Sequence, residues 1–210
     1  MNLVVESAAD RHVVFYDTSW DFYEAVLRQY DERPTRVNYA NGTLEIMTLS
    51  IEHERYSQAL GEMVADVAKR LRVPFARGGS ATLRSQSQAR GLEADQCFWV
   101  ANESAVRNVD RLDLAIHPPP DLVIEVDITH AVVDRESIYA KLGVPEMWHF
   151  DTQTLLTAWE LTNGNWTRID RSKAFPAVRP VEFNPFLQRI RTDGHMAAMV
   201  AFGDWVDALR

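Results

Sequence analysis

The sequence has a single cysteine, Cys97, among its 210 residues, so an internal disulfide is excluded. Such sparse cysteine usage is typical of a reducing compartment. No apolar run approaches the roughly 18 residues that suggest a membrane helix. The first twelve residues carry acidic and basic side chains where a signal peptide would be apolar. We therefore expect a cytoplasmic protein with no membrane partner.

A basic excess is missing as well. The formal net charge is -8, from 22 lysines and arginines against 30 aspartates and glutamates. Proteins that bind nucleic acid usually show a basic excess, so this balance counts against such a partner. It does not exclude a nuclease, which needs only a local carboxylate cluster for metal and a local basic patch for phosphates.

Three catalytic signatures are also lacking. The six histidines show no paired ligand spacing, and with one cysteine this argues against a zinc site. No glycine-rich phosphate loop stands between a strand and a helix. No nucleophile elbow marks a Ser-His-Asp hydrolase. The candidate chemistry is therefore that of carboxylates.

The apolar fraction of 46% and the charged fraction of 25% suit one globular domain spanning residues 1–210. Apolar periodicity and turn residues predict helices at 20–30, 51–71, 134–142, 186–190 and 196–209, a hairpin at 36–48, and strands at 95–101, 122–128, 147–150, 155–161 and 166–170. Residues 84–90 are interpreted as a loop, and the first dozen residues show no clear period. This order predicts an α/β protein of the α+β type, with a mixed β-sheet core flanked by helices.

Glu125 stands in the middle of the near-continuous β-branched run at 122–128, which predicts a central strand buried on both faces. A carboxylate there is costly unless it is paired or binds a metal. Asp121 and Asp127 share its face, because side chains alternate along a strand. A metal site is one interpretation. The alternative is structural: Asp121 caps the strand start and Glu125 pairs with an arginine.

Two further acidic positions could join such a site. Asp95 opens the strand at 95–101, and acidic strand ends can converge across a sheet, where oxygen ligands suit Mg²⁺ or Mn²⁺. Asp95 could equally be an exposed loop residue. His53 and Glu54 begin the long helix, so Glu54 could reach a metal and His53 a phosphate. An acidic residue in a first turn also simply complements the helix dipole.

Four stretches, in this order, resemble a known family. They are 39–47 with the following His53-Glu54, then Gly91-Leu-Glu-Ala-Asp95, then Pro120-Asp121-Leu-Val-Ile-Glu125-Val, and finally Ile138-Tyr-Ala-Lys-Leu-Gly-Val-Pro-Glu-Met-Trp148. Together they are similar to the bacterial family classed as restriction endonucleases within the PD-(D/E)XK nuclease superfamily. The resemblance covers about residues 36–151 and extends more loosely beyond.

The resemblance implies a restriction-endonuclease-like mixed sheet flanked by helices, a Mg²⁺-type site and hydrolysis of DNA phosphodiesters. Asp95 matches the family's first acidic position, although Ala94 replaces the usual proline before it. Glu125 matches the second acidic position. Asp121 is similar to the aspartate of the family's Pro-Asp-Leu-Val pattern, and Glu54 matches a helix carboxylate found in many superfamily members.

The basic position departs from the pattern. The superfamily has a lysine two residues after the second acid, where this chain has Asp127. In the family that lysine usually lies on the next helix, four residues before the tyrosine, and Arg135 occupies that place before Tyr139. Arginine can hold a phosphate but cannot act as a base. Lys141 is a possible substitute, although it lies off the helix face of Arg135.

Three hypotheses follow. The first is a Mg²⁺- or Mn²⁺-dependent DNA endonuclease, with Asp95 and Glu125 as ligands, Asp121 or Glu54 completing the site, and Arg135 or Lys141 stabilising the phosphate. Because duplex cutting needs two strands cleaved, a homodimer is plausible. The second is a catalytically lapsed module on the same fold that binds nucleic acid or a protein partner. The third is an unrelated mixed α/β structural protein in which Glu125 is salt-bridged.

Overall fold

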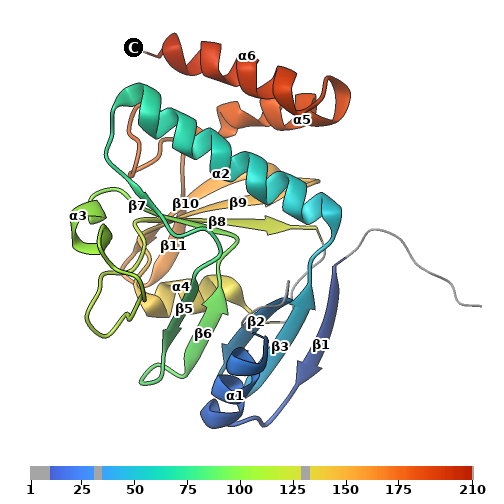
Figure 1. Ribbon diagram of the computed structural model, residues 1–210, viewed down its shortest axis with the longest axis vertical. Helices are drawn as coiled ribbons and strands as arrows, with labels where there is room; N and C mark the ends of the chain where they lie inside the picture. The colour runs from blue at the N-terminus through green and yellow to red at the C-terminus, as the bar shows by residue number, and fades with distance from the viewer. Residues whose placement is uncertain (1–9, 31–34, 129–132, 210) are drawn as a thin grey trace, which may run out of the picture.

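Two β-sheets form the frame of the molecule in a computed structural model that describes residues 10–30, 35–128 and 133–209. The first sheet is antiparallel with the order β1-β3-β2-β6-β5. Its strands are β1 (Arg11–Phe15), β2 (Thr35–Ala40), β3 (Thr43–Thr48), β5 (Thr82–Ser85) and β6 (Arg90–Glu93). The hairpin strands β2 and β3 lie beside the edge strand β1 (Figure 1).

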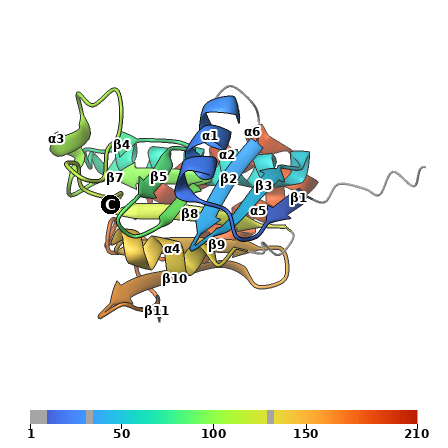
Figure 2. The ribbon, with the colours of Figure 1, turned by 90° about the horizontal axis from the view of Figure 1, so that it is seen from below.

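The second sheet is mixed and has the order β11-β10-β9-β8-β7-β4. Its strands are β4 (Ala76–Arg77), β7 (Gln96–Trp99), β8 (Leu122–Asp127), β9 (Glu146–Asp151), β10 (Leu155–Thr162) and β11 (Asn165–Ile169). The central strands β8 and β9 run parallel, whereas β7 and β10 are antiparallel to their neighbours. Figure 2 shows β11 at one edge of the molecule and α1 (Trp20–Tyr30) at the opposite edge.

The remaining helices cover the mixed sheet. They are α2 (Ile51–Leu71), α3 (Glu103–Val106), α4 (Arg135–Leu142), the 3-10 helix η1 (Pro180–Phe183), α5 (Asn184–Thr192) and α6 (His195–Asp207). Helices α2, α5 and α6 pack on one face of the mixed sheet, and α4 packs on the other together with β5 and β6. No helix in the described part of the chain is long and apolar enough to cross a membrane.

Local sequence explains the elements that carry the site. Asn41 and Gly42 have φ angles of 45° and 90°, the pair of positive angles that a type I′ hairpin turn requires. Helix α2 starts at Ser50, whose hydroxyl accepts a hydrogen bond from the backbone nitrogen of His53 at 3.1 Å. Asp134 caps α4 in the same way, and Gly143 ends it in the left-handed region at φ 79°.

Strand β8 separates two kinds of interior. Leu122, Ile124 and Val126 point into the apolar layer beneath α2, α5 and α6. Val123 points the opposite way, into the layer that contains Ile138 and Tyr139 of α4. Glu125 therefore lies on the α4 side, because side chains alternate along a strand. This strand is central and buried, as the β-branched run predicts.

The predicted fold class, a mixed sheet flanked by helices, is confirmed, but two local predictions are wrong. The loop predicted at 84–90 is confined to a turn at 86–89, since residues 84, 85 and 90 belong to the hairpin strands β5 and β6. The strand β1 was not expected, because Val13 and Phe15 face solvent and leave no apolar period on a buried face. The hairpin at 36–48 also belongs to a second sheet rather than to the mixed one.

Candidate active site

The acidic centre arises from the register of two neighbouring strands. Strands β7 and β8 are antiparallel with Gln96 opposite Ile124. Asp95 directly precedes Gln96 and Glu125 directly follows Ile124, so the two carboxylates lie at the same end of this strand pair. Both side chains are buried, with Asp95 1% and Glu125 4% exposed. Two buried carboxylates in this position repel each other unless cations lie beside them.

Helix α4 supplies one of these cations to Glu125. An Arg135 Nη2 atom lies 2.6 Å from Glu125 Oε2, and the same nitrogen donates to the backbone oxygen of Glu93 at 2.9 Å. The Tyr139 hydroxyl donates a hydrogen bond to Glu125 Oε1. Arg135 and Tyr139 reach one carboxylate because residues four apart share a helix face. The sequence analysis offered an ion pair between Glu125 and an arginine as the alternative to a metal site. That ion pair is present in the structure.

Helix α2 supplies the cation beside Asp95. His53 is fully buried, and its Nε2 atom lies 3.0 Å from Asp95 Oδ1. Its Nδ1 atom lies 3.1 Å from Asp10 Oδ2, while Asp10 Oδ1 accepts the backbone N–H of Ser50 at 2.6 Å. The other oxygen of Asp95 accepts the backbone N–H of Val126 at 2.9 Å. A continuous chain of contacts therefore runs from Asp10 through His53 to Asp95.

The electrostatics of the centre follow from burial and these charges. Burial lowers the pKa of His53, but Asp95 and Asp10 outweigh burial and raise it to about 10. Burial raises the pKa of Asp95, yet Arg135 and His53 lower it to about 2. For Glu125 burial prevails over the Arg135 charge and raises the pKa to about 7. Asp95 is thus ionised at neutral pH, whereas the ionisation of Glu125 changes with pH near neutrality.

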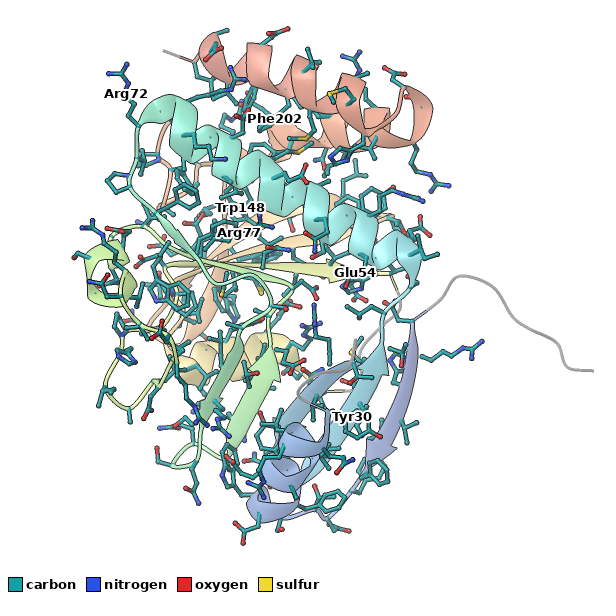
Figure 3. The ribbon with its side chains drawn as sticks, viewed as in Figure 1. Tyr30, Glu54, Arg72, Arg77, Trp148 and Phe202 are labelled. Atoms are coloured by element: carbon teal, nitrogen blue, oxygen red, sulfur yellow. The ribbon has the colours of Figure 1, made fainter. Side chains whose placement is uncertain are left out.

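Glu54 lies at the margin of this centre. Figure 3 shows it at the end of α2 nearest the hairpin sheet. One of its carboxylate oxygens lies 3.9 Å from Arg36 Nη2, and Arg36 Nε lies 3.9 Å from Asp95 Oδ1. The side chain of Glu54 is 44% exposed, so it is both near the centre and open to solvent. The structure thus brings Glu54 close to Asp95, with Arg36 between them.

Asp121, predicted as a catalytic and metal-binding residue, is not brought into this centre. Its carboxylate accepts the backbone N–H groups of Val100 at 2.7 Å and Asn102 at 2.9 Å, and the side-chain amide of Asn102 at 2.7 Å. It stands four residues before Glu125 on one strand, about 13 Å away at roughly 3.3 Å per residue. We correct its role to that of a cap that holds the loop after β7.

Lys141, the predicted substitute for a catalytic lysine, also lies elsewhere. It is exposed in the last turn of α4 and makes no hydrogen bond or ion pair with the described residues. Six residues after Arg135 it is rotated by about 240°, so it projects from another face of the helix. The basic group that α4 contributes to the acidic centre is Arg135. Asp127, at the lysine position of the superfamily, lies 4.0 Å from His149.

Sequence reasoning missed three residues of the centre. Tyr139 gave a usable signal, because it follows Arg135 by four residues on a short helix. Asp10 gave none, since it lies more than forty residues from His53 in a segment without periodicity. Arg36 gave only weak information, as one of many charged residues in a hairpin. Contacts of this kind depend on how the two sheets meet.

Divalent ions such as Mg²⁺ require oxygen ligands, which the acidic centre offers on Asp95 and Glu125. Among the described residues, Asp95 Oδ1 and Glu125 Oε2 are buried atoms without a hydrogen-bond partner, but each lies close to a cation, His53 Nε2 at 3.0 Å and Arg135 Nη2 at 2.6 Å. In the described ranges, no three histidine, cysteine or acidic side chains form a ready metal cage. Magnesium is usually held by one or two carboxylates, with water and substrate phosphate completing its shell. The two neighbouring carboxylates therefore fit a Mg²⁺-type ion but not a metal that needs a full protein cage.

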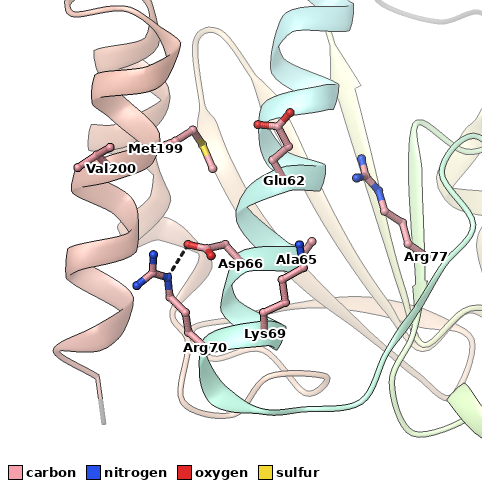
Figure 4. A pocket seen from close by; sticks show the side chains of 8 residues that line it. All are labelled: Glu62, Ala65, Asp66, Lys69, Arg70, Arg77, Met199 and Val200. Carbon is pink, nitrogen blue, oxygen red and sulfur yellow. Dashed lines mark hydrogen bonds and ion pairs between the residues drawn. The ribbon is translucent and has the colours of Figure 1, made fainter.

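Two hollows help to delimit the site. A cavity of about 190 Å³ adjoins the acidic centre and is lined by Glu125, Asp127, Arg135 and His149, with Met47 and Met147 as its apolar walls. A larger hollow of about 370 Å³ lies between α2 and α6 (Figure 4). Its lining mixes acids and bases, and Arg70 is paired with Asp66 at 2.8 Å. The second hollow therefore offers no acidic centre.

Comparison with known proteins gives the class of this molecule. The family model described as "Uma2: Putative restriction endonuclease" matches residues 20–188, which is most of the chain. The protein therefore belongs to this family. The resemblance stated from the four sequence stretches is confirmed. No curated protein matches the sequence.

A solved structure supports the fold assignment. It is described as a "putative nuclease belonging to DUF820 from Anabaena variabilis ATCC 29413" and is similar with a TM-score of 0.51. Sequence identity is 13%, and the match covers 70% of this chain and 87% of the other. At this identity the similarity shows a shared nuclease-like fold.

Proposed function

We propose that this protein is a divalent-metal-dependent nuclease that hydrolyses phosphodiester bonds of DNA. The observation that carries the proposal is the pair of neighbouring, buried carboxylates Asp95 and Glu125, each of which turns one oxygen toward cationic side chains among the described residues. Membership in a family of restriction-endonuclease type and a nuclease-like fold support it.

In this proposal Asp95 and Glu125 are the protein ligands of Mg²⁺ or Mn²⁺. When bound, the ion supplies Lewis-acid stabilisation of charge on a phosphodiester. Glu54 is near enough to act through a bridging water and is exposed enough to receive one. The His53 contact fixes the orientation of Asp95, and the Val126 backbone N–H holds its second oxygen. These contacts preorganise the acid before substrate arrives.

Arg135 has a fixed charge in this arrangement. A guanidinium stays protonated, so Arg135 cannot take a proton from water. Its contacts with Glu125 and with the Glu93 carbonyl hold the second acid in place and offset the repulsion between the two carboxylates. Arg135 is therefore a positioning residue for Glu125 rather than a base.

The test is cleavage of supercoiled and linear DNA by the purified protein with Mg²⁺ or Mn²⁺, with and without EDTA. Glu125→Gln keeps the shape of the side chain and removes its charge. Glu62→Gln is the matched control, because Glu62 is an exposed acid of α2 that contacts His195 outside the acidic centre. We expect cleavage by the wild type and by Glu62→Gln, and none by Glu125→Gln or in EDTA. Equal cleavage by all three proteins would contradict the proposal.

A second candidate function is a non-catalytic nuclease-fold module that binds nucleic acid or a protein partner. The specific observation in its favour is Arg135 in the place of the family's lysine, engaged in an ion pair at 2.6 Å. Arg135→Lys separates the two candidates. Cleavage gained by this variant from an inactive wild type would identify a lapsed enzyme.

A further inference from the structure

Arg36 has an unusual environment for a guanidinium. It lies on β2, its side chain is only 14% exposed, and its Nε atom is buried without a hydrogen-bond partner. Within the described ranges its closest acidic atoms are Asp95 Oδ1 and Glu54 Oε1, each 3.9 Å away. At that distance the charges attract each other, but no hydrogen bond forms.

Three other arginines, on or beside the strands next to β2 and β7, are already engaged in hydrogen bonds or ion pairs. Arg77 donates two hydrogen bonds to Gln96 Oε1, at 2.8 and 3.1 Å. Arg84 pairs with Glu24, and Arg90 donates to Asn41 and to backbone oxygens of its own turn. A guanidinium carries five N–H donors, and leaving them unmet in the interior is costly. The Nε atoms of Arg90 and Arg135 are also buried without a partner, but each of these guanidinium groups donates hydrogen bonds through another nitrogen. Among these arginines, Arg36 alone makes no side-chain hydrogen bond to the described residues.

The position of Arg36 indicates what that acceptor is. Strand alternation turns Arg36 and Asn38 toward the acidic centre, while Val37 and Tyr39 pack in the layer with α1. The neighbouring Glu54 side chain is half exposed, so this edge of the centre opens to solvent. A phosphate presents several oxygens to one planar guanidinium. The carboxylates of Asp95 and Glu54 are too far from Arg36 to supply this geometry.

We propose that Arg36 donates hydrogen bonds to a backbone phosphate of the nucleic acid at the acidic centre. The inference rests on the proposed function. It assigns to Arg36 the phosphate contact for which the sequence analysis considered Arg135 or Lys141. Arg135 then remains the partner of Glu125. The role is non-covalent and moves no proton.

The test compares Arg36→Met with Arg36→Lys and with Arg168→Met. The last is a matched control, because Arg168 is an exposed arginine of β11, at the far edge of the mixed sheet. Equilibrium binding of duplex DNA is measured over a range of salt concentrations in Ca²⁺ and in EDTA. Binding of Mn²⁺ alone is measured by calorimetry, and circular dichroism verifies folding.

For Arg36→Met we expect DNA binding in Ca²⁺ to weaken about tenfold and the slope of log affinity against log salt to fall by about 1. We expect Mn²⁺ binding to stay equal or become tighter, because a cation has been removed from beside the acids. Arg36→Lys should be intermediate, since it keeps the charge but not the planar donors. Arg168→Met should match the wild type.

Each other outcome overturns the inference in a recognisable way. Loss of both DNA and Mn²⁺ binding in Arg36→Met would make Arg36 a structural support of Asp95 and Glu54. DNA affinity equal to that of a wild type that cleaves DNA would refute the Arg36 contact alone. A wild type that neither binds nor cleaves DNA would overturn the proposed function together with this inference.

Discussion

The two faces of the mixed sheet differ in the ion pairs that are buried beside their apolar cores. On the α2 side, Phe183 packs edge-on against Trp148, Phe202 and Trp205, with ring centroids 4.8–5.8 Å apart. On the α4 side, Glu125 and Asp95 share a buried layer with cations from three other elements. Both layers meet at strand β8. Successive side chains of this six-residue strand point alternately into one layer and the other. Both faces therefore have an apolar core, and the α4 face in addition holds the ion pairs of the acidic centre, whose burial is costly.

The largest expected effect on stability comes from removing a buried ring from the apolar layer beneath α2, α5 and α6. Phe202→Ala should lower the free energy of unfolding by about 4 kcal/mol, because a fully buried ring is lost and a cavity remains. Mn²⁺ affinity of the folded protein should be unchanged. Chemical denaturation and calorimetry measure the two quantities, with Phe22→Ala as an exposed control. A large change in Mn²⁺ affinity would show that the faces are not separate.

Arg135→Met should have the next largest effect, about 3 kcal/mol at pH 8, because it leaves the buried carboxylate of Glu125 without its guanidinium partner. The loss should shrink as pH falls. Burial already raises the pKa of Glu125 to about 7, and removing Arg135 raises it further, so the folded state takes up a proton that the unfolded state releases near pH 4.5. Unfolding in EDTA from pH 8 to pH 5 measures this trend. A loss that grows toward pH 5 would contradict it.

His53→Gln should cost about 2 kcal/mol at pH 6, because Asp10 and Asp95 lose a charged hydrogen-bond donor. The pKa of His53 is raised to about 10, so its contribution is complete below about pH 6.5 and disappears as pH rises through 10. The difference from wild type should therefore narrow at alkaline pH in EDTA. A difference independent of pH would mean that His53 is neutral in the folded state.

The smallest effect is expected at Asp121, which directly precedes β8. Asp121→Asn should cost about 1 kcal/mol, because the amide can accept only part of the three hydrogen bonds that the carboxylate receives. Mn²⁺ affinity should equal that of wild type. Lys141→Ala, at an exposed position, should change neither quantity. Weaker Mn²⁺ binding in Asp121→Asn would restore Asp121 to the metal site.

The sequence predicted what depends on short-range pattern. The helices at 20–30 and 51–71 begin and end where the apolar periodicity predicts. Glu125 inside a β-branched strand pointed to an unusual site, because a buried carboxylate is costly unless a cation or hydrogen-bond donors compensate it. Asp121 was assigned by strand alternation, which gives the face of a side chain but not its distance along the strand.

Long-range contacts were beyond reach. The register that places Asp95 and Glu125 at the same end of a strand pair depends on the pairing of two strands separated by more than twenty residues. Arg36 and Asp10 reach the centre only because the antiparallel sheet meets the start of α2. No periodicity within a single segment contains that information. The two-sheet division was missed for the same reason, because local propensity does not state which strand pairs with which.

The chain of contacts from Asp10 through His53 to Asp95, together with Arg135 from α4, has a consequence for how the molecule forms. Its members lie far apart in sequence, so loop-closure entropy opposes each contact until the sheets have assembled. During synthesis, the partners of Glu125 become available only after residues 135–139 have left the ribosome. The acidic centre is therefore a late product of folding, and a partly made chain holds its carboxylates apart and hydrated.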